Sequence, residues 1–273
     1  MNPENIGEAE CGIVPLSALR DNYIWLLRRG GRAVVVDPGD AAPVLAYLAG
    51  QSLELVAVLV THHHADHVAG ITALCEKFPK TRVYGPSGEK IVGLTHPLGE
   101  GEFEVVELPG MNMRFQVIGV PGHTQGHLAY YEPNWSGHGL LFSGDTLFSA
   151  GCGRLFEGTP EQMQRSLARL RCLPPETRVF CAHEYTEANL RFASVVEPDN
   201  RLIAEYAAHI ARQRASGLPS LPTTLAIECQ INPFLRWDKP TVRQAAQRYS
   251  GYSPGGNVDV NVFAAIRAWK NEF

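Results

Sequence analysis

Residues 61–67 read THHHADH and place four histidines and one aspartate within a single short segment. An apolar run at 55–60 precedes this segment and has the length of a strand, and the apolar residues of 68–78 have helical spacing. We therefore expect the segment at a turn from a strand into a helix. So many imidazole and carboxylate groups in one turn indicate metal binding, because these are nitrogen and oxygen donors that divalent ions take from proteins.

The geometry of such a turn separates the donors into two sets. Side chains of an extended chain alternate between faces, so His62 and His64 point the same way and His63 points away. Where the helix begins, Asp66 and His67 become adjacent donors that suit a second ion. We expect His63 to be a packed or hydrogen-bonded neighbour. The alternatives are a solvated polar turn or a structural zinc site, but structural sites are usually closed by four ligands, often Cys, and this segment has no Cys.

Three later segments each place a donor after an apolar, strand-like run. They are PGHTQGH with His123, SGDTLF with Asp145 and AHEYT with His183. If either segment stood alone, His123 or Asp145 would be interpreted as a surface residue. The prediction that they are metal ligands therefore depends on all the motifs together. A buried, unpaired carboxylate is costly, whereas a carboxylate between two cations is not. We expect His127 either to support the ligands or to be structural, and for Asp37 we favour turn structure over support of the site.

Composition limits the class of protein. The chain has 273 residues, 45% of them hydrophobic and 19% charged, which is ordinary for a globular protein of one large domain or two. A net charge of −4 argues against a broad nucleic-acid-binding surface. The six cysteines form no CxxC pair and are typical of reduced thiols. Residues 1–10 have no signal-peptide pattern, and no apolar run has membrane-spanning length. We expect a cytoplasmic monomer with no nucleic-acid or membrane partner.

The order of elements predicts layered sheets followed by helices. We expect strands at 12–16, 23–27, 33–36, 55–60, 82–84, 103–108, 115–120, 128–131, 140–143 and 178–181. We expect helices at 42–49, 68–78, 161–170, 187–196, 200–216, 242–249 and 260–270. A doubly wound parallel sheet is the alternative, but the phosphate-binding glycine pattern of many such folds is missing.

The combined motifs resemble those of the metallo-β-lactamase superfamily, and more closely those of glyoxalase II, the hydroxyacylglutathione hydrolases. They are THHHADH, PGHTQGH, SGDTLF, CGRLFEGT, AHEYT and NPFLR, and the resemblance covers nearly the whole chain. It implies an α+β fold, with an αββα sandwich as the catalytic domain at 1–183 and a helical substrate-binding domain at 184–273. It also implies that His62, His64 and His123 hold one ion, that Asp66, His67 and His183 hold the other, and that Asp145 bridges them.

The same resemblance implies a reaction. S-D-lactoylglutathione would be hydrolysed to D-lactate and glutathione by a metal-bridging hydroxide, with Asp66 and Asp145 as catalytic carboxylates, in the detoxification of methylglyoxal. Zinc is the preferred ion, and the donors also accept iron or manganese. Substrate contacts are implied for Arg154, Tyr185, Arg236 and Lys239, since Arg and Lys pair with carboxylates; the alternative is that the cations are solvated surface residues. Phe156 stands where some members have a tyrosine.

Two other activities share parts of this pattern. A persulfide dioxygenase of the superfamily would use one iron and oxygen, and a non-catalytic binder of glutathione conjugates would need no open metal centre. Seven donors and the helical region with NPFLR favour the two-metal hydrolase over both. That helical region also disfavours a β-lactamase, and the lack of a basic composition disfavours an RNA-processing nuclease.

Overall fold

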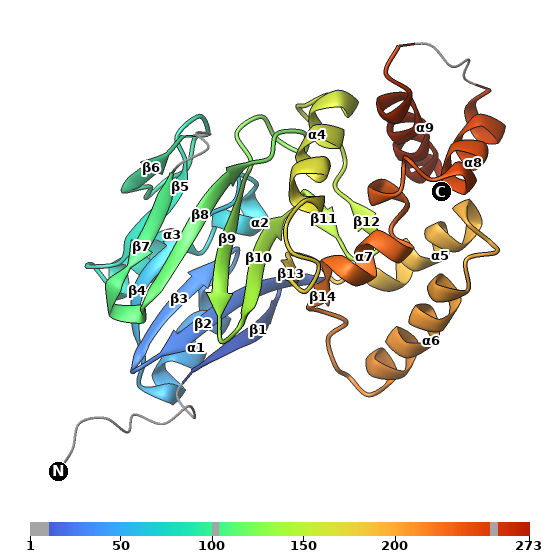
Figure 1. Cartoon of the computed structure of the whole chain (residues 1–273). Helices are drawn as coiled ribbons and strands as arrows, with labels where there is room; N and C mark the ends of the chain where they lie inside the picture. The colour runs from blue at the N-terminus through green and yellow to red at the C-terminus, as the bar shows by residue number, and fades with distance from the viewer. Residues whose placement is uncertain (1–10, 100–103, 252–255) are drawn as a thin grey trace.

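Two mixed sheets face each other in the computed structural model, which describes residues 11–99, 104–251 and 256–273 (Figure 1). The first sheet has the order β1 (Gly12–Ala18), β2 (Asn22–Arg29), β3 (Arg32–Val36), β4 (Glu54–Leu59), β5 (Arg82–Pro86) and β6 (His96–Leu98). The second has the order β14 (Thr223–Thr224), β13 (Arg178–Cys181), β10 (His138–Gly144), β9 (Leu128–Trp135), β8 (Met113–Gly119) and β7 (Val105–Leu108). A short ribbon pairs β11 (Leu147–Phe148) with β12 (Gly151–Cys152).

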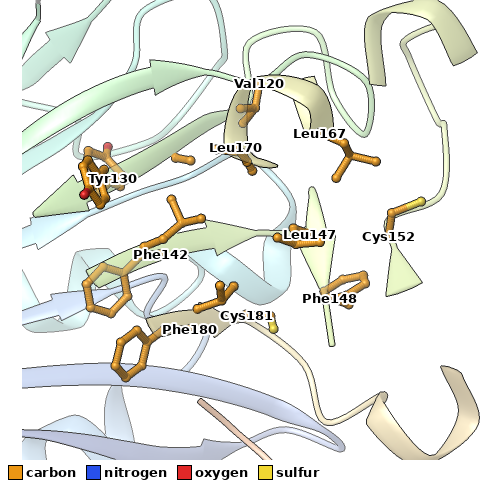
Figure 2. Close-up of a cluster of buried hydrophobic side chains, with 14 of the residues drawn as sticks. Val120, Tyr130, Phe142, Leu147, Phe148, Cys152, Leu167, Leu170, Phe180 and Cys181 are labelled. Carbon is orange, nitrogen blue, oxygen red and sulfur yellow. The ribbon is translucent and has the colours of Figure 1, made fainter. Parts of the chain in front are cut away.

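Successive side chains of the strands contribute to different faces of the sheet, and both faces are apolar. In β2, Trp25 and Leu27 belong to the cluster between the sheets, whereas Ile24 and Leu26 belong to the cluster under α1 (Ala41–Gln51) and α3 (Ile71–Lys77). Successive side chains of a strand point to opposite faces, so a strand that is apolar throughout must be covered on both sides. Figure 2 shows the larger cluster continuing through β10 and β13 to α4 (Pro160–Arg171).

Helices make up most of the chain after β13. They are α5 (Thr186–Val196), α6 (Arg201–Ala215), α7 (Leu225–Ile231), α8 (Pro240–Ser250) and α9 (Val258–Glu272). They pack beside the end of the sandwich that carries β11 and β12 (Figure 1). Among the described residues, no helix is both long and apolar enough to cross a membrane.

The sequence predicted this α+β sandwich with a C-terminal helical region, and the structure confirms it; the doubly wound parallel sheet is wrong. The strand expected at 103–108 is β7, which begins at Val105; Phe103 lies outside the described residues. Residues 1–10, on which the prediction of a cytoplasmic location partly rests, also lie outside them.

The helix expected at 68–78 is interrupted. It consists of α2 (Ala65–Val68) and α3, with Gly70 between them. Gly70 N donates to Pro38 O over 2.8 Å, which brings the two backbones into contact. A Cβ at this position would lie 2.6 Å from that oxygen. The interruption therefore comes from a close approach that the helical spacing of the sequence does not reveal.

We predict that Gly70→Ala lowers stability by about 1–3 kcal/mol, the usual cost of overpacking, because its neighbours are backbone atoms that cannot rotate away. Gly50→Ala is the matched control, since a Cβ there meets nothing within 4 Å inside α1. That control is expected to gain about 0.5–1 kcal/mol. Thermal unfolding of the metal-free proteins measures both changes, and equal midpoints for the two variants would contradict the account.

Candidate metal centre

The predicted donors converge at one edge of the sandwich. The THHHADH segment follows β4 of the first sheet, and the segments with His123, Asp145 and His183 follow β8, β10 and β13 of the second. Leu128 N donates to Thr61 O over 2.9 Å and joins the two sheets at this edge. Four segments far apart in the sequence therefore reach one place because their strands end there.

Three histidines form the first group. His62 Nε2 lies 3.1 Å from His64 Nδ1, and His123 Nε2 lies 3.0 Å from the same atom. The other ring nitrogen of His123 bonds Arg154 O at 2.9 Å, and that of His62 contacts Thr61 Oγ1 at 3.0 Å. The acceptor behind each of these two rings, His62 and His123, fixes its tautomer, so the inward nitrogen keeps its lone pair.

Asp66, His67 and His183 form the second group. Asp66 Oδ2 lies 3.5 Å from His67 Nε2 and 3.4 Å from His183 Nε2. Behind the rings, His183 Nδ1 bonds Asp21 Oδ1 at 2.8 Å and His67 Nδ1 lies 3.1 Å from Asp37 Oδ2. This is the carboxylate–histidine arrangement that orients metal-binding imidazoles.

Asp145 lies between the two groups. Its Oδ2 is 3.3 Å from His123 Nε2, while its Oδ1 is 3.3 Å from His183 Nε2 and 3.5 Å from His67 Nε2. One carboxylate therefore faces both groups, one oxygen to each. Its backbone N–H donates to His127 Nε2 over 3.1 Å, so the buried His127 holds Asp145 in place, in line with the supporting role expected for it.

The electrostatics suit cations. Burial lowers the pKa of His62, His64 and His123, which favours the neutral imidazole that binds metals. Burial works against the charges of Asp145 and His67, yet their mutual attraction holds the pKa of Asp145 below its usual range and raises that of His67. Within the described residues, the buried His67 Nε2 and Asp145 Oδ1 have no hydrogen-bond partner.

The donors thus fit divalent metal ions. Groups with donor atoms within 4.8 Å of one another are His62–His64–His123, His62–His67–Asp145 and Asp66–His67–His183. A buried site with inward lone pairs, ionised carboxylates and atoms without partners is costly unless cations occupy it.

Asp37 does more than the sequence indicated. Turn structure was the favoured interpretation, but its carboxylate accepts from Thr61 N over 2.7 Å and from Thr61 Oγ1 over 2.8 Å, besides facing His67. The aspartate is buried and has φ 53°, a left-handed conformation. The prediction is corrected because these long-range contacts make Asp37 a support for the site.

A hollow of about 540 Å³ opens beside the metal-binding cluster. His123 and Asp145 line it together with Arg154 and Tyr185, two of the predicted substrate contacts. The Tyr185 ring stacks on His183 with 4.7 Å between centroids. Phe156, 62% exposed, lies at the same hollow with its ring 5.2 Å from that of His123.

Arg236 and Lys239 lie elsewhere, which corrects their expected place at this hollow. Arg236 Nε and Nη2 bond the Glu197 carboxylate at 2.7 and 3.0 Å and lie at a separate hollow. Lys239 directly precedes α8 and is not among the residues that line the hollow beside the metal-binding cluster. From the NPFLR motif, the buried Asn232 contacts the β11–β12 ribbon beside the site, since its Nδ2 donates to Phe148 O and Gly151 O over 3.1 and 3.0 Å.

Arg267 and Lys270 of α9 line the hollow in their place. Arg267 Nη1 donates to Cys152 O over 2.8 Å, and its Nε is buried without a partner. Among the described residues, neither cation nor Arg154 forms an ion pair, so this wall carries unbalanced positive charge. The spacing of 267 and 270 places both on one helix face, a signal that the sequence analysis did not use.

Helices α5 and α7 hold the loop that forms one side of the hollow. Glu228, fully buried, accepts from Ser149 Oγ over 2.9 Å and from Ala150 N over 2.8 Å. Asn189 Nδ2 donates to Ser149 O over 3.0 Å. The helical region therefore shapes the loop that follows Asp145.

Comparison with known proteins agrees with the fold. Residues 19–183 match the model of the metallo-β-lactamase superfamily, and residues 184–273 match that of the hydroxyacylglutathione hydrolase C-terminus. The structure of ETHE1 from Myxococcus xanthus shares the fold, with a TM-score of 0.61, 24% identity and coverage of 95% of this chain and 99% of that one. A structure of TTHA1623 in a di-iron-bound form has a TM-score of 0.56 and 30% identity, covering 82% of this chain and 100% of that one.

Fold and site together define a protein of the metallo-β-lactamase superfamily. The hydroxyacylglutathione hydrolase of Aliivibrio salmonicida is 51% identical over 262 residues, which cover 96% of this chain and 99% of that protein. The one from Nitrosomonas europaea is 48% identical over 261 residues, covering 96% of each chain. The chain belongs to the hydroxyacylglutathione hydrolase family.

We predict that Asp37→Asn weakens metal binding about 10–100-fold, the usual effect of losing a carboxylate that orients a ligand. The matched control is Asp40→Asn, because Asp40 caps α1 by accepting from Ala42 N over 2.9 Å and asparagine caps equally well. Competition with a chromogenic chelator measures both affinities. Equal metal affinity in the Asp37 variant and the wild type would show that the contact with His67 does not matter for binding.

Proposed function

We propose that the protein hydrolyses S-D-lactoylglutathione to D-lactate and glutathione at a two-metal centre. One observation carries the proposal: five imidazoles each direct a ring nitrogen toward the same site, and the Asp145 carboxylate lies between the two groups that they form. The proposed ligands are His62, His64 and His123 for one ion and Asp66, His67 and His183 for the other, with Asp145 between them. The family membership supports the reaction and its place in methylglyoxal detoxification.

The wall of the hollow supports a glutathione thioester as substrate. Glutathione carries two carboxylates, and Arg154, Arg267 and Lys270 offer three cations at this wall. Charge-assisted hydrogen bonds to carboxylates are among the stronger polar contacts in proteins. We propose these cations and Tyr185 as the substrate contacts, in place of Arg236 and Lys239.

The residues of the chain have distinct parts in the proposed reaction. When bound, the two cations supply a hydroxide at neutral pH and polarise the thioester carbonyl. We propose Asp66 and Asp145 as the catalytic carboxylates. The neighbouring His67 ring lowers the pKa of Asp66, so both carboxylates are ionised at neutral pH and offset the charge of the cations. A thiol with a pKa of about 8.5 leaves as a thiolate, so the reaction needs no dedicated general acid.

Several finer points stay predictions. Zinc is the proposed ion, although the donors also suit iron and manganese. We propose a catalytic domain at 1–183 and a substrate-binding domain at 184–273, which the limits of the two family models support. The cytoplasmic location and the monomeric state rest on the sequence.

We predict that purified protein releases thiol from S-D-lactoylglutathione, that chelation abolishes the release and that added divalent metal restores it. Oxygen consumption with glutathione persulfide is measured in parallel and is expected to be absent. Oxygen uptake with little thiol release would point to a dioxygenase, and inactivity of the metal-loaded protein in both assays would favour a binder of glutathione conjugates.

Lys270 gives the reaction a pH dependence at its alkaline side. Burial and the neighbouring Arg267, Arg191 and Arg154 lower the pKa of Lys270 to about 8. The ammonium that attracts an anionic substrate is therefore present below pH 8 and lost above it. In Lys270→Arg the charge stays, because arginine does not titrate in this range.

We therefore predict that kcat/KM of the wild type falls relative to Lys270→Arg above pH 8. The fall approaches about tenfold, since one charge-assisted hydrogen bond contributes about 1.5 kcal/mol. Because kcat/KM reports on the free enzyme, a bound anion does not mask the titration. Parallel profiles for the two proteins from pH 6 to 10 would exclude Lys270 from substrate binding.

A further inference from the structure

Glu89 lies in the connection between β5 and β6 and is not among the proposed metal ligands. Only 4% of its side chain is exposed, so its carboxylate is buried. A buried carboxylate needs hydrogen-bond donors or a cation to offset the loss of hydration. The donors that surround Glu89 come from the two loops that carry the three-histidine group.

Each oxygen of Glu89 faces one of these loops. Oε2 accepts from His63 N over 2.6 Å and lies 3.0 Å from His63 Nδ1. Oε1 accepts from the Thr124 hydroxyl and, over 3.1 Å, from Gly126 N. The carboxylate thus joins the THHHADH loop to the PGHTQGH loop.

Both contacts lie next to metal-binding side chains in the sequence. His63 stands between His62 and His64, and Thr124 follows His123. A shift of either loop moves an imidazole of the three-histidine group, whose inward nitrogens lie 3.0 to 3.1 Å apart. Metal sites depend on ligands held within about 0.5 Å of the required geometry.

A third loop completes the connection. His63 Nε2 lies 3.4 Å from Glu157 Oε1, and Glu157 Oε2 accepts from Gln125 N over 2.9 Å. His63, Glu89 and Glu157 also have donor atoms within 4.8 Å of one another. The Glu89 oxygens are already occupied by hydrogen bonds, so this set serves better as a bridge between loops than as another ion site.

We propose that Glu89 is a positioning residue for the three-histidine group, acting through His63 and Thr124. The inference rests on the proposed two-metal function. Replacing the carboxylate by the amide of glutamine removes one of its two acceptor oxygens. Either His63 N–H or the Thr124 hydroxyl and Gly126 N–H then lose their acceptor in a buried place, and the connection between the two loops is weakened.

The test compares Glu89→Gln with Glu76→Gln in the full chain loaded with two equivalents of Zn²⁺. Glu76 is exposed on α3 and serves as the matched control. Competition with a chromogenic chelator is expected to show one ion bound 10–100-fold more weakly in Glu89→Gln and unchanged binding in Glu76→Gln. With thioester substrate, kcat is expected to fall while KM stays within about twofold of the wild-type value, and excess Zn²⁺ is expected to restore kcat.

Thermal unfolding separates positioning from a general structural role. A structural role alone would lower the Tm of the metal-free variant and leave the affinity for both ions unchanged, which would overturn the proposal. Thr124→Val retains the charge of Glu89 and removes one donor. Thr124→Val is expected to weaken the binding of one ion severalfold. If Glu89→Gln does not fold, this variant decides the question, because an unchanged affinity for both ions would again overturn the proposal.

The binding assay uses no substrate, so the two proposals fail in different ways. Wild-type protein that binds two ions but cleaves no thioester would contradict the proposed function and leave the comparison of Glu89 variants intact. Wild-type protein that binds no ion would overturn both.

Discussion

The packing of five imidazoles around two carboxylates at one edge of the sandwich is the constraint on which the site depends. Each of four rings has an acceptor behind it or beside it: Thr61 for His62, Arg154 O for His123, Asp37 for His67 and Asp21 for His183. These contacts direct the remaining nitrogens inward, where divalent cations offset the cost of burying them. The four rings follow strands of both sheets, and Asp21, which precedes β2 of the first sheet, supports His183, which follows β13 of the second, so the centre forms only when the sandwich closes.

The helical region contributes to the same site from the other side. Glu228, Asn189 and Asn232 hold the loop of β11 and β12, and α9 adds Arg267 and Lys270 to the wall of the hollow. The loop that they hold begins directly after Asp145. The division into a metal-binding part and a substrate-binding part is therefore not strict, because the second part also shapes the surroundings of the first.

Much of this was predictable from local sequence. The donors lie in short motifs after apolar strands, and strands that are apolar on both faces indicate a covered sheet, so the donor set and the layered fold followed from the pattern. Contacts between distant segments did not follow. Asp37 faces His67 and Arg267 faces Cys152 only because strands and helices pack together, and no local pattern records that packing. The placement of Arg236 failed for the same reason, since its partner Glu197 lies 39 residues away.

The central claim is that seven side chains from four loops hold two ions with Asp145 between them. Anomalous diffraction from crystals of the metal-loaded protein tests this directly. The account predicts two peaks per chain, one among His62, His64 and His123 and one among Asp66, His67 and His183, both next to Asp145. A single peak confined to the three histidines, or peaks that do not contact Asp145, would contradict it.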